Sequence, residues 1–319
     1  MVVVGGATRL TGSGLSITQW KPVSGALPPM SDHAWARAFG EYRATPQYRL
    51  VNRGMSMGEF QFIYWWEWAH RLLGRVVGAA FAIPFAVFLI ARRLPKRLIW
   101  RCATLLGLGA LQGLVGWWMV KSGLEARISV APERLAAHLG LALVLYGALI
   151  WTALEAWAGE AGREDRRRDA WRVAGAALAA GIFVQCLLGA LTAGDKAGLI
   201  DNDWPLMGGR LVPIDYWRGS FWATMAHGAS AVQFNHRLAG YGLLILGLGV
   251  AIAAARARQL PGAIRGLAIA VGALVSAQVA LGVLTLWSGV SLPLAILHQT
   301  NATIVLGAAL CTAWRTCRI

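Results

Sequence analysis

The sequence predicts an all-α polytopic membrane protein, an eight-helix bundle built from two pseudo-twofold-related halves of four helices. Three observations support this fold class: the composition, the long apolar runs and an internal repeat. Of the 319 residues, 57% are hydrophobic and 14% are charged, and the mean hydropathy is +0.52. Water-soluble enzymes and disordered chains are excluded, because neither leaves so much apolar surface facing water.

Seven apolar runs are long enough to cross a membrane as helices, which takes about 20 residues each. They cover residues 69–91, 102–120, 136–156, 172–193, 228–254, 266–287 and 295–314. The short apolar segment Met1–Ala7 is interpreted as the end of a truncated first helix. We expect about 13 more residues of that helix upstream, so that it can span the bilayer. The predicted domains are an N-terminal half at 1–156, a linker at 157–171 and a C-terminal half at 172–319.

The basic residues indicate the orientation of the chain in the membrane. Half of the 30 Lys and Arg residues lie in four short segments, at 92–101, 157–172, 256–265 and 315–319. Short loops rich in Lys and Arg stay in the cytoplasm, so these segments and the C-terminus are predicted to be cytoplasmic. The net charge of +15 is therefore a topology signal, and no nucleic-acid binding is expected.

An internal repeat relates the two halves. The segment Gln112–Gly123, followed by His138, resembles Gln278–Gly289, followed by His298. The Gly6-Ala7 pair is aligned with Gly189-Ala190, which implies four helices in each half. An even number of spans keeps the same orientation, so the predicted axis runs along the membrane normal.

Four of the six histidines occupy equivalent positions of the repeat, near the predicted outer ends of their helices. They are His70, His138, His236 and His298. Two imidazoles from facing helices, with no carboxylate or thiolate cluster nearby, suit the axial positions of a haem better than a zinc site. We therefore expect one porphyrin site in each half. The other two histidines, His33 and His227, are predicted to lie in loops, with an interfacial position also open for His227.

Arginines follow the first histidine of each pair, two in the first half and one in the second. Arg71 and Arg237 come directly after it, and Arg75 lies one turn deeper in the first half. Each guanidinium is placed to bind a haem propionate with two hydrogen bonds, or to reach a lipid phosphate.

Several longer motifs now identify a family. They are Gly14–Pro29 (GLSITQWKPVSGALPP), Glu67–Arg71 (EWAHR), Trp204–Met207 (WPLM), Gln233–Arg237 (QFNHR) and Leu297–Gln299 (LHQ). Together they resemble the haem A synthase family. The resemblance implies an oxidoreductase that converts the C8 methyl group of haem O to a formyl group and supplies haem A to terminal oxidases.

The resemblance also implies a division of labour between the halves. His236 and His298, with Arg237, match the residues that hold a resident haem b. His70 and His138, with Arg71 and Arg75, match the pair that binds the substrate haem O, with iron as the metal in both sites. Glu67 matches an acidic catalytic residue. Because Glu67 and His70 are three residues apart, they share a helix face, and we expect Glu67 to transfer protons. The alternative is a structural Glu67, solvated by headgroups or paired with Arg71.

The predicted location is the bacterial cytoplasmic (inner) membrane, with the histidine sites toward the outer face. The expected partners are the lipid bilayer, haem O with the haem O synthase that supplies it, and an unidentified electron donor; a homo-oligomer is left open. Two other functions compete. One is a dihaem b-type electron-transfer cytochrome without catalysis, and the other is a transporter with a site at the membrane midplane.

Overall fold

The computed structural model describes residues 1–125, 127–158 and 169–317. In these residues all regular elements are helices, and seven helices are long and apolar enough to cross a membrane. They are α4 (Met57–Ile90), α5 (Lys96–Glu125), α6 (Pro132–Ala158), α7 (Asp169–Gly194), α9 (Ala229–Arg256), α10 (Gly262–Trp287) and α11 (Leu292–Thr316). The polytopic all-α class and the seven predicted spans are confirmed.

The chain divides into two compact units, Met1–Leu141 and Ala142–Ile319, with the boundary inside α6. Most of the predicted linker at 157–171, including four of its arginines, lies outside the described residues. The proposed division at that linker therefore remains a prediction. The eight-helix count does too, because α1 (Val2–Leu10) is only 9 residues long.

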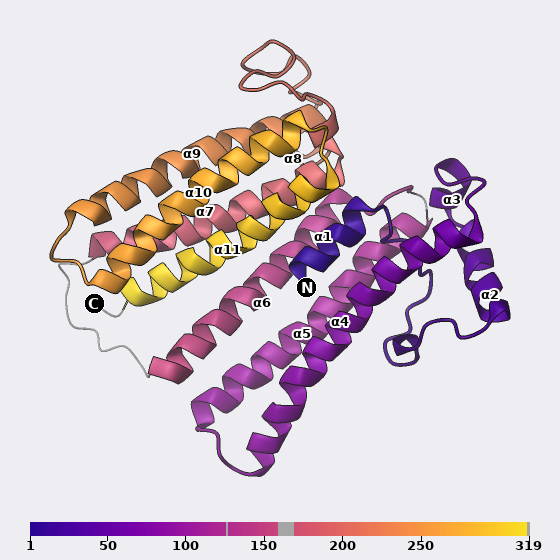
Figure 1. Ribbon diagram of the computed structural model, residues 1–319, viewed down its shortest axis with the longest axis horizontal. Coiled ribbons are helices and arrows are strands. Elements are labelled where there is room, and N and C mark those ends of the chain that lie inside the picture. Colours follow the sequence, from indigo (N-terminus) through magenta and orange to yellow (C-terminus); the bar gives the residue numbers. More distant parts are fainter. Residues whose placement is uncertain (126, 159–168, 318–319) are drawn as a thin grey trace. The chain divides into compact units, whose positions relative to one another are not determined.

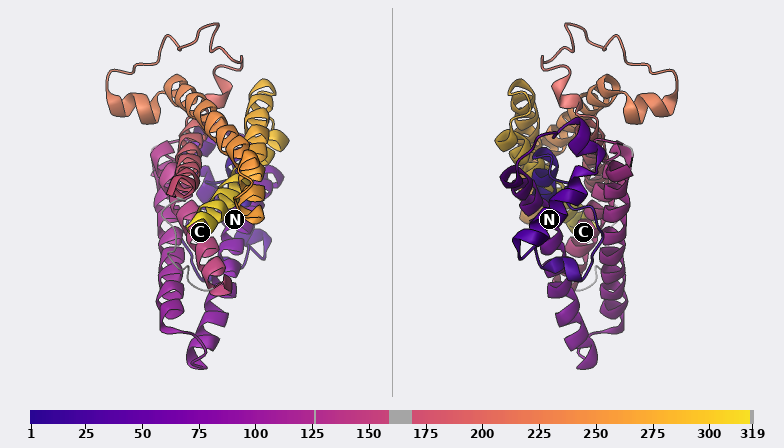
Figure 2. Two further views of the ribbon diagram at one scale, coloured as in Figure 1. Left: turned by 90° about the vertical axis from the view of Figure 1, so that its left-hand side faces the viewer. Right: turned by 90° about the vertical axis from the view of Figure 1, so that its right-hand side faces the viewer.

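In the second unit, α7, α9, α10 and α11 form a closed four-helix bundle (Figures 1 and 2). Both α7 and α10 pack against α9 and against α11. Small residues allow this close approach: a Cβ atom on Gly272 of α10 would lie 2.6 Å from Cβ of Ala251 on α9. The segment between α7 and α9 contains η3 (Ala197–Leu199) and α8 (Phe221–His227), and it extends past one end of the bundle.

In the first unit, α4 and α5 lie side by side, and α1 packs on α4 (Figure 1). Two short helices, α2 (Asp32–Arg43) and α3 (Pro46–Leu50), follow the loop that contains η1 (Ser24–Ala26). An aromatic cluster that includes buried Tyr42 and Phe60 joins α2 to the first turns of α4.

Helix α4 begins 12 residues before the predicted span at 69–91. Its start is marked by a capping box, in which the Ser56 side chain and the Glu59 carboxylate satisfy backbone N–H groups at the helix end. The added turns are stabilised by the aromatic cluster, whose buried members include Phe60 and Tyr64. The hydropathy pattern marks only the lipid-facing part of the helix.

The loop predictions for His33 and His227 were wrong, while the interfacial position of His227 stays a prediction. His33 is the second residue of α2, and its exposed ring lies 3.5 Å from Arg37 one turn later in the same helix. His227 is the last residue of α8, where its ring packs edge-on against Trp222. Helix α2 does carry an apolar stripe with helical spacing, at Trp35, Ala38, Phe39 and Tyr42, which the hydropathy of the long spans overshadowed. Helix α8 has only 7 residues after its serine cap, too few for a periodic pattern.

The contacts of two threonines correct the alignment of the repeat. The Thr8 hydroxyl donates to O of Val4 at 2.9 Å and approaches O of Trp66 at 3.3 Å. The Thr192 hydroxyl makes the same pair of contacts with Leu188 and Val232, at 2.9 and 3.3 Å. Gly5, and not Gly6, therefore corresponds to Gly189. The predicted register was wrong by one residue because the Gly5-Gly6 doublet fits either way.

Candidate functional site

The ring of each of the four repeated histidines packs against a glycine of a neighbouring helix. The position of a Cβ atom on that glycine would lie 2.9 to 3.2 Å from Cε1 of the imidazole. The four pairs are Gly5 with His70, Gly116 with His138, Gly189 with His236 and Gly282 with His298. Since carbon atoms in contact lie about 3.5 to 4.0 Å apart, no larger residue fits there without moving the ring.

The two histidines of the second unit lie close together. In the second unit, the ring centroids of His236 and His298 are 6.5 Å apart and the ring planes make an angle of 77°. Two imidazoles on opposite sides of one metal ion, with metal–nitrogen bonds of about 2 Å, would place their centroids about 6 Å apart. In the first unit, His70 and His138 each contact a glycine of a neighbouring helix, and their pairing stays a prediction.

Three glutamines complete this arrangement. Nε2 of Gln112 lies 3.1 Å from Nδ1 of His138, Nε2 of Gln185 lies 3.1 Å from Nδ1 of His236, and Nε2 of Gln278 lies 3.2 Å from Nδ1 of His298. Each glutamine precedes the glycine under the same histidine by four residues, about one helical turn. Sequence reasoning used this Gln-x-x-x-Gly spacing to align the repeat but assigned the glutamines no role.

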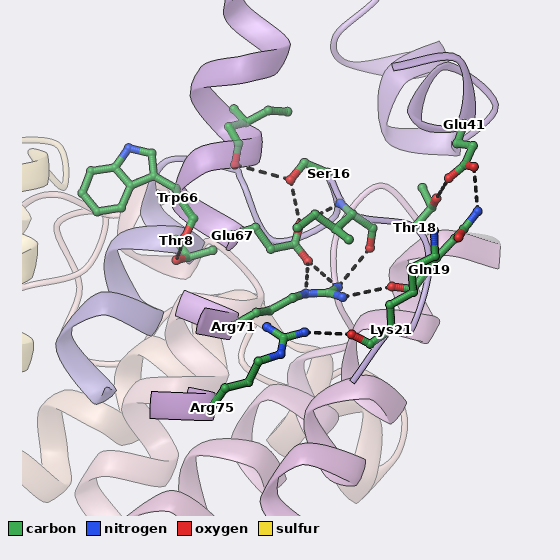
Figure 3. Close-up of polar contacts among 12 residues, drawn as sticks. Thr8, Ser16, Thr18, Gln19, Lys21, Glu41, Trp66, Glu67, Arg71 and Arg75 are labelled. Atoms are coloured by element: carbon green, nitrogen blue, oxygen red, sulfur yellow. Dashed lines mark hydrogen bonds and ion pairs between the residues drawn. The ribbon is translucent and has the colours of Figure 1, made fainter. Parts of the chain in front are cut away.

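Glu67 is buried, with 3% of its surface exposed, and it is surrounded by donors (Figure 3). Its Oε2 accepts from the Ser16 hydroxyl at 2.7 Å and from the Ile17 N–H at 2.9 Å. Its Oε1 accepts from Nη2 of Arg71 at 2.6 Å and from Nε at 3.1 Å. The carboxylate is therefore not solvated by headgroups. Its hydrogen bonds from Ser16 and Ile17 join α4 to the loop after α1, and its buried ion pair with Arg71 lies within α4.

The arginines that follow the histidines bind backbone carbonyls (Figure 3). Arg71 donates from Nη2 to O of Ile17 at 3.0 Å and from Nη1 to O of Gln19 at 3.1 Å. Arg237 donates in the same way to O of Asp201 at 2.7 Å and to O of Asp203 at 2.9 Å. Arg71 therefore binds the loop after α1, and Arg237 binds the loop after α7.

Arg75 also binds this loop, donating to O of Lys21 (Figure 3) and to O of Pro22, both at 2.8 Å. Some donors remain unused. Nη1 of Arg75 and Nε of Arg237 are buried and have no hydrogen-bond partner among the described residues. These two N–H groups are the ones left for a carboxylate such as a propionate.

A tryptophan in each loop extends the correspondence. Trp20 stacks on Trp117 of α5 with ring centroids 6.1 Å apart, and Arg71 lies 6.0 Å from the centroid of Trp117. In the second unit Trp204 packs edge-on against Trp287 of α10 at 6.3 Å. The loop tryptophans Trp20 and Trp204 occupy equivalent positions, but their partners do not, because Trp117 corresponds to Val283.

One position differs in chemistry between the units. The counterpart of Glu67, three residues before the histidine of α9, is Gln233. It is 2% exposed, and its Nε2 donates to O of Asp201 at 3.0 Å. Both side chains bind the loop of their own unit, but only Glu67 can accept or release a proton.

Outside the spans, the second loop is stabilised by an aspartate. The exposed Asp203 carboxylate accepts from the N–H groups of Gly208 and Gly209, both at 3.1 Å. These backbone hydrogen bonds hold the pKa of Asp203 below its ordinary value.

The donor set fits a haem better than a bare metal ion. Among the described residues no three His, Cys, Asp or Glu side chains are grouped to hold a metal. Each unit instead offers two imidazoles, glycines that leave room beside them and a buried guanidinium donor. A porphyrin supplies the four remaining ligands of its own iron, so two histidines are sufficient.

The fold and these sites define a polytopic helical membrane protein with two histidines packed against glycines in each of two related halves. The chain belongs to the COX15-CtaA family of cytochrome oxidase assembly proteins, whose family model matches residues 1–310. It is 58% identical over 318 residues to a haem A synthase of a Caulobacter species, covering 100% of this chain and 92% of the relative.

Two further relatives are similar over nearly the whole chain. The haem A synthase of Parvibaculum lavamentivorans is 48% identical over 310 residues, which cover 97% of this chain and 88% of the relative. The haem A synthase of Rhodopseudomonas palustris is 48% identical over 309 residues, which cover 96% of this chain and 84% of the relative.

Proposed function

We propose that this protein is a haem-dependent oxidoreductase that makes haem A from haem O. In the overall conversion the C8 methyl group of haem O loses two hydrogen atoms and gains one oxygen atom to become a formyl group. The observation that carries the proposal is the duplicated arrangement of histidine, glycine and arginine, with an acid in one copy only. Glu67 of the first unit corresponds to Gln233 in the second. Two similar haem sites with different chemistry are what an enzyme needs if one haem is a cofactor and the other a substrate.

The position of Glu67 decides which site we assign to the substrate haem and which to the resident haem. We place the substrate haem O between His70 and His138, in the unit that contains Glu67. The resident haem b then belongs between His236 and His298, where the counterpart of the acid is an amide. The buried N–H groups of Arg75 and Arg237 are the proposed propionate contacts. The bound haems supply the oxidising and electron-transfer chemistry through their iron.

The contribution of the chain is to orient the substrate and to control water and protons. The loop after α1 is held against α4 by Arg71 and against α5 by Trp20. Within it, the Ser16 hydroxyl donates to Oε2 of Glu67 at 2.7 Å, which makes a short path for a proton between the loop and α4. A catalytic Glu67 would take up or release a proton at Oε2 as the methyl group is oxidised.

We also propose a membrane location, an orientation and two partners for this enzyme. We place the protein in the bacterial cytoplasmic membrane, with its C-terminus in the cytoplasm and both sites toward the outer face. The distribution of Lys and Arg supports this orientation. A haem O synthase would supply the substrate, and an electron donor would reduce the resident haem. A non-catalytic dihaem relay would have no use for an acid at one site alone.

The test is to express the chain together with a haem O synthase in cells that make no haem A, and to identify the extracted haems by mass spectrometry. The proposal predicts new haem A, and it predicts none from the same cells carrying the His70→Ala variant. Haem O that stays unconverted, in a protein with a normal reducible b-type spectrum, would instead support the relay.

A further inference from the structure

The four histidines are not held equally, and the difference involves the glutamines. The amide nitrogen of Gln112 is 3.1 Å from Nδ1 and 3.3 Å from Nε2 of His138. For Gln278 and His298 the two distances are 3.2 and 3.3 Å. An atom this near to both ring nitrogens in the ring plane would collide with Cε1 between them. The amide therefore lies over the face of each imidazole.

The amides are themselves anchored. Nε2 of Gln112 also donates to O of His138 at 3.0 Å, and Nε2 of Gln185 donates to O of His236 at 2.8 Å. An amide fixed to the backbone of the histidine and placed against its ring resists rotation of that ring. With a glycine against Cε1, each of these rings is restrained by two contacts from one neighbouring helix.

The amide of Gln278 is anchored by another side chain. Nδ2 of Asn301 donates to Oε1 of Gln278 at 2.8 Å and to O of Leu274 at 3.1 Å. Asn301 lies three residues after His298 on α11, so it faces the same neighbour. The Gln278 amide is thus held in place by Asn301, as the other two amides are held by the histidine carbonyls.

His70 has the glycine contact without the amide. Its Nδ1 is buried and has no hydrogen-bond partner among the described residues. In the corrected register, the residue that corresponds to Gln185 is Met1, whose thioether carries no N–H group. The ring of His70 is therefore held by packing against Gly5 but not by an amide.

We propose that Gln112, Gln185 and Gln278 are positioning residues that hold three axial histidines in place, and that His70 is the one exchangeable ligand. This inference rests on the proposed function, because it assigns His70 to the substrate haem. Release of His70 would open one side of the substrate iron to a small molecule, while His138 keeps the haem in its site. In the second unit both ligands would stay bound, as suits a haem that only transfers electrons.

Carbon monoxide binding to the reduced protein tests the inference without reference to activity. The full chain is used in two backgrounds: His236→Ala with His298→Ala leaves the first site, and His70→Ala with His138→Ala leaves the second. We expect the haem in the first site to bind carbon monoxide at least about 10-fold more tightly. Equal affinities, or tighter binding at the second site, would overturn the inference.

A glutamine variant in the second background separates positioning from general damage. Gln278→Met keeps the size of the side chain but removes the amide, and we expect it to raise carbon monoxide affinity about 10-fold. Ser276→Ala, on the same helix, removes a hydroxyl that donates to O of Gly272 in that helix and makes no ring contact among the described residues, so it should leave the affinity unchanged. Unchanged binding in Gln278→Met, with haem content intact, contradicts the positioning role.

The ferric EPR spectrum provides a second readout, because the anisotropy of a low-spin haem signal depends on the angle between the axial imidazole planes. The 77° angle predicts a strongly anisotropic signal for the second site. Gln278→Met should shift or broaden it, and the Ser276→Ala control should retain it. An identical signal in Gln278→Met refutes the inference. Failure of either background to bind haem at all would refute the proposed function itself, and this inference with it.

Discussion

Replacing Gly282 by alanine places one methyl group against a histidine ring that must not move. In the structure the added Cβ would lie 3.0 Å from Cε1 of His298 and 3.5 Å from its Nδ1. An ordinary carbon contact needs about 3.5 to 4.0 Å, so the ring has to shift by roughly 0.5 to 1 Å. Without haem the ring can turn aside, but an iron-bound ring is fixed at Nε2. The cost therefore falls mainly on the haem-bound form.

Overpacking of this kind costs about 1 to 3 kcal/mol, which corresponds to roughly 5- to 150-fold in haem affinity. The control is Gly266→Ala in the same helix, where no atom lies within 4 Å of the added Cβ. In both variants alanine stabilises the helix by about 1 kcal/mol relative to glycine, so this gain cancels when the two variants are compared.

The assay is a haem titration of the purified apoprotein in detergent, with absorbance spectra of the bound haem and a thermal unfolding curve for each variant. We expect Gly282→Ala to bind haem more weakly while its apoprotein unfolds at or above the wild-type temperature. Gly266→Ala should bind as the wild type does. Equal haem affinity in the two variants would show that Gly282 does not make room for the haem-binding ring of His298.

Three further predictions concern the polar contacts. Glu67→Gln should retain both haems but stall oxidation, measured as haem O or its alcohol in extracts, and haem A formation at the wild-type rate in this variant would remove the acid from the mechanism. Arg71→Met should destabilise the first unit by about 3 to 5 kcal/mol, because it leaves a buried carboxylate unpaired, and a chemical denaturation shift below about 1 kcal/mol would contradict this. The pKa of Asp203 is lowered in the folded loop, so its contribution to loop stability is present above pH about 4 and lost as the pH falls further; protease cleavage of the loop should rise on acidification in the wild type, and Asp203→Asn should be cleaved to a similar extent across that range.

The sequence was sufficient for the spans and for the pairing of His236 with His298 because both depend on periodic patterns. A helix in lipid needs a long apolar run, and equivalent histidines on repeated helices must meet in equivalent ways. The early start of α4 was not predictable from hydropathy. It depends on the contact of Phe60 with Tyr42 of another helix, and aromatic residues are equally common at membrane interfaces.

The contacts of Arg71 and of the glutamines were missed for a different reason. Arg71 binds carbonyls more than 50 residues away in the sequence, and a backbone carbonyl leaves no mark on the residue type. Gln112 and Gln278 were visible as repeated polar residues in apolar helices. Whether such an amide faces a ring, a backbone or a lipid headgroup depends on how the helices are rotated, which the spacing alone does not determine.

The central claim is that the two histidine pairs hold different haems, one as cofactor and one as substrate. The most direct measurement is the haem content of His70→Ala and His298→Ala, each purified from cells that supply haem O and analysed by mass spectrometry of the extracted haems. The account predicts that His298→Ala loses haem b, and that His70→Ala keeps haem b but contains neither haem O in its normal amount nor haem A. Loss of the same haem in equal proportion from both variants would contradict the division into cofactor and substrate halves.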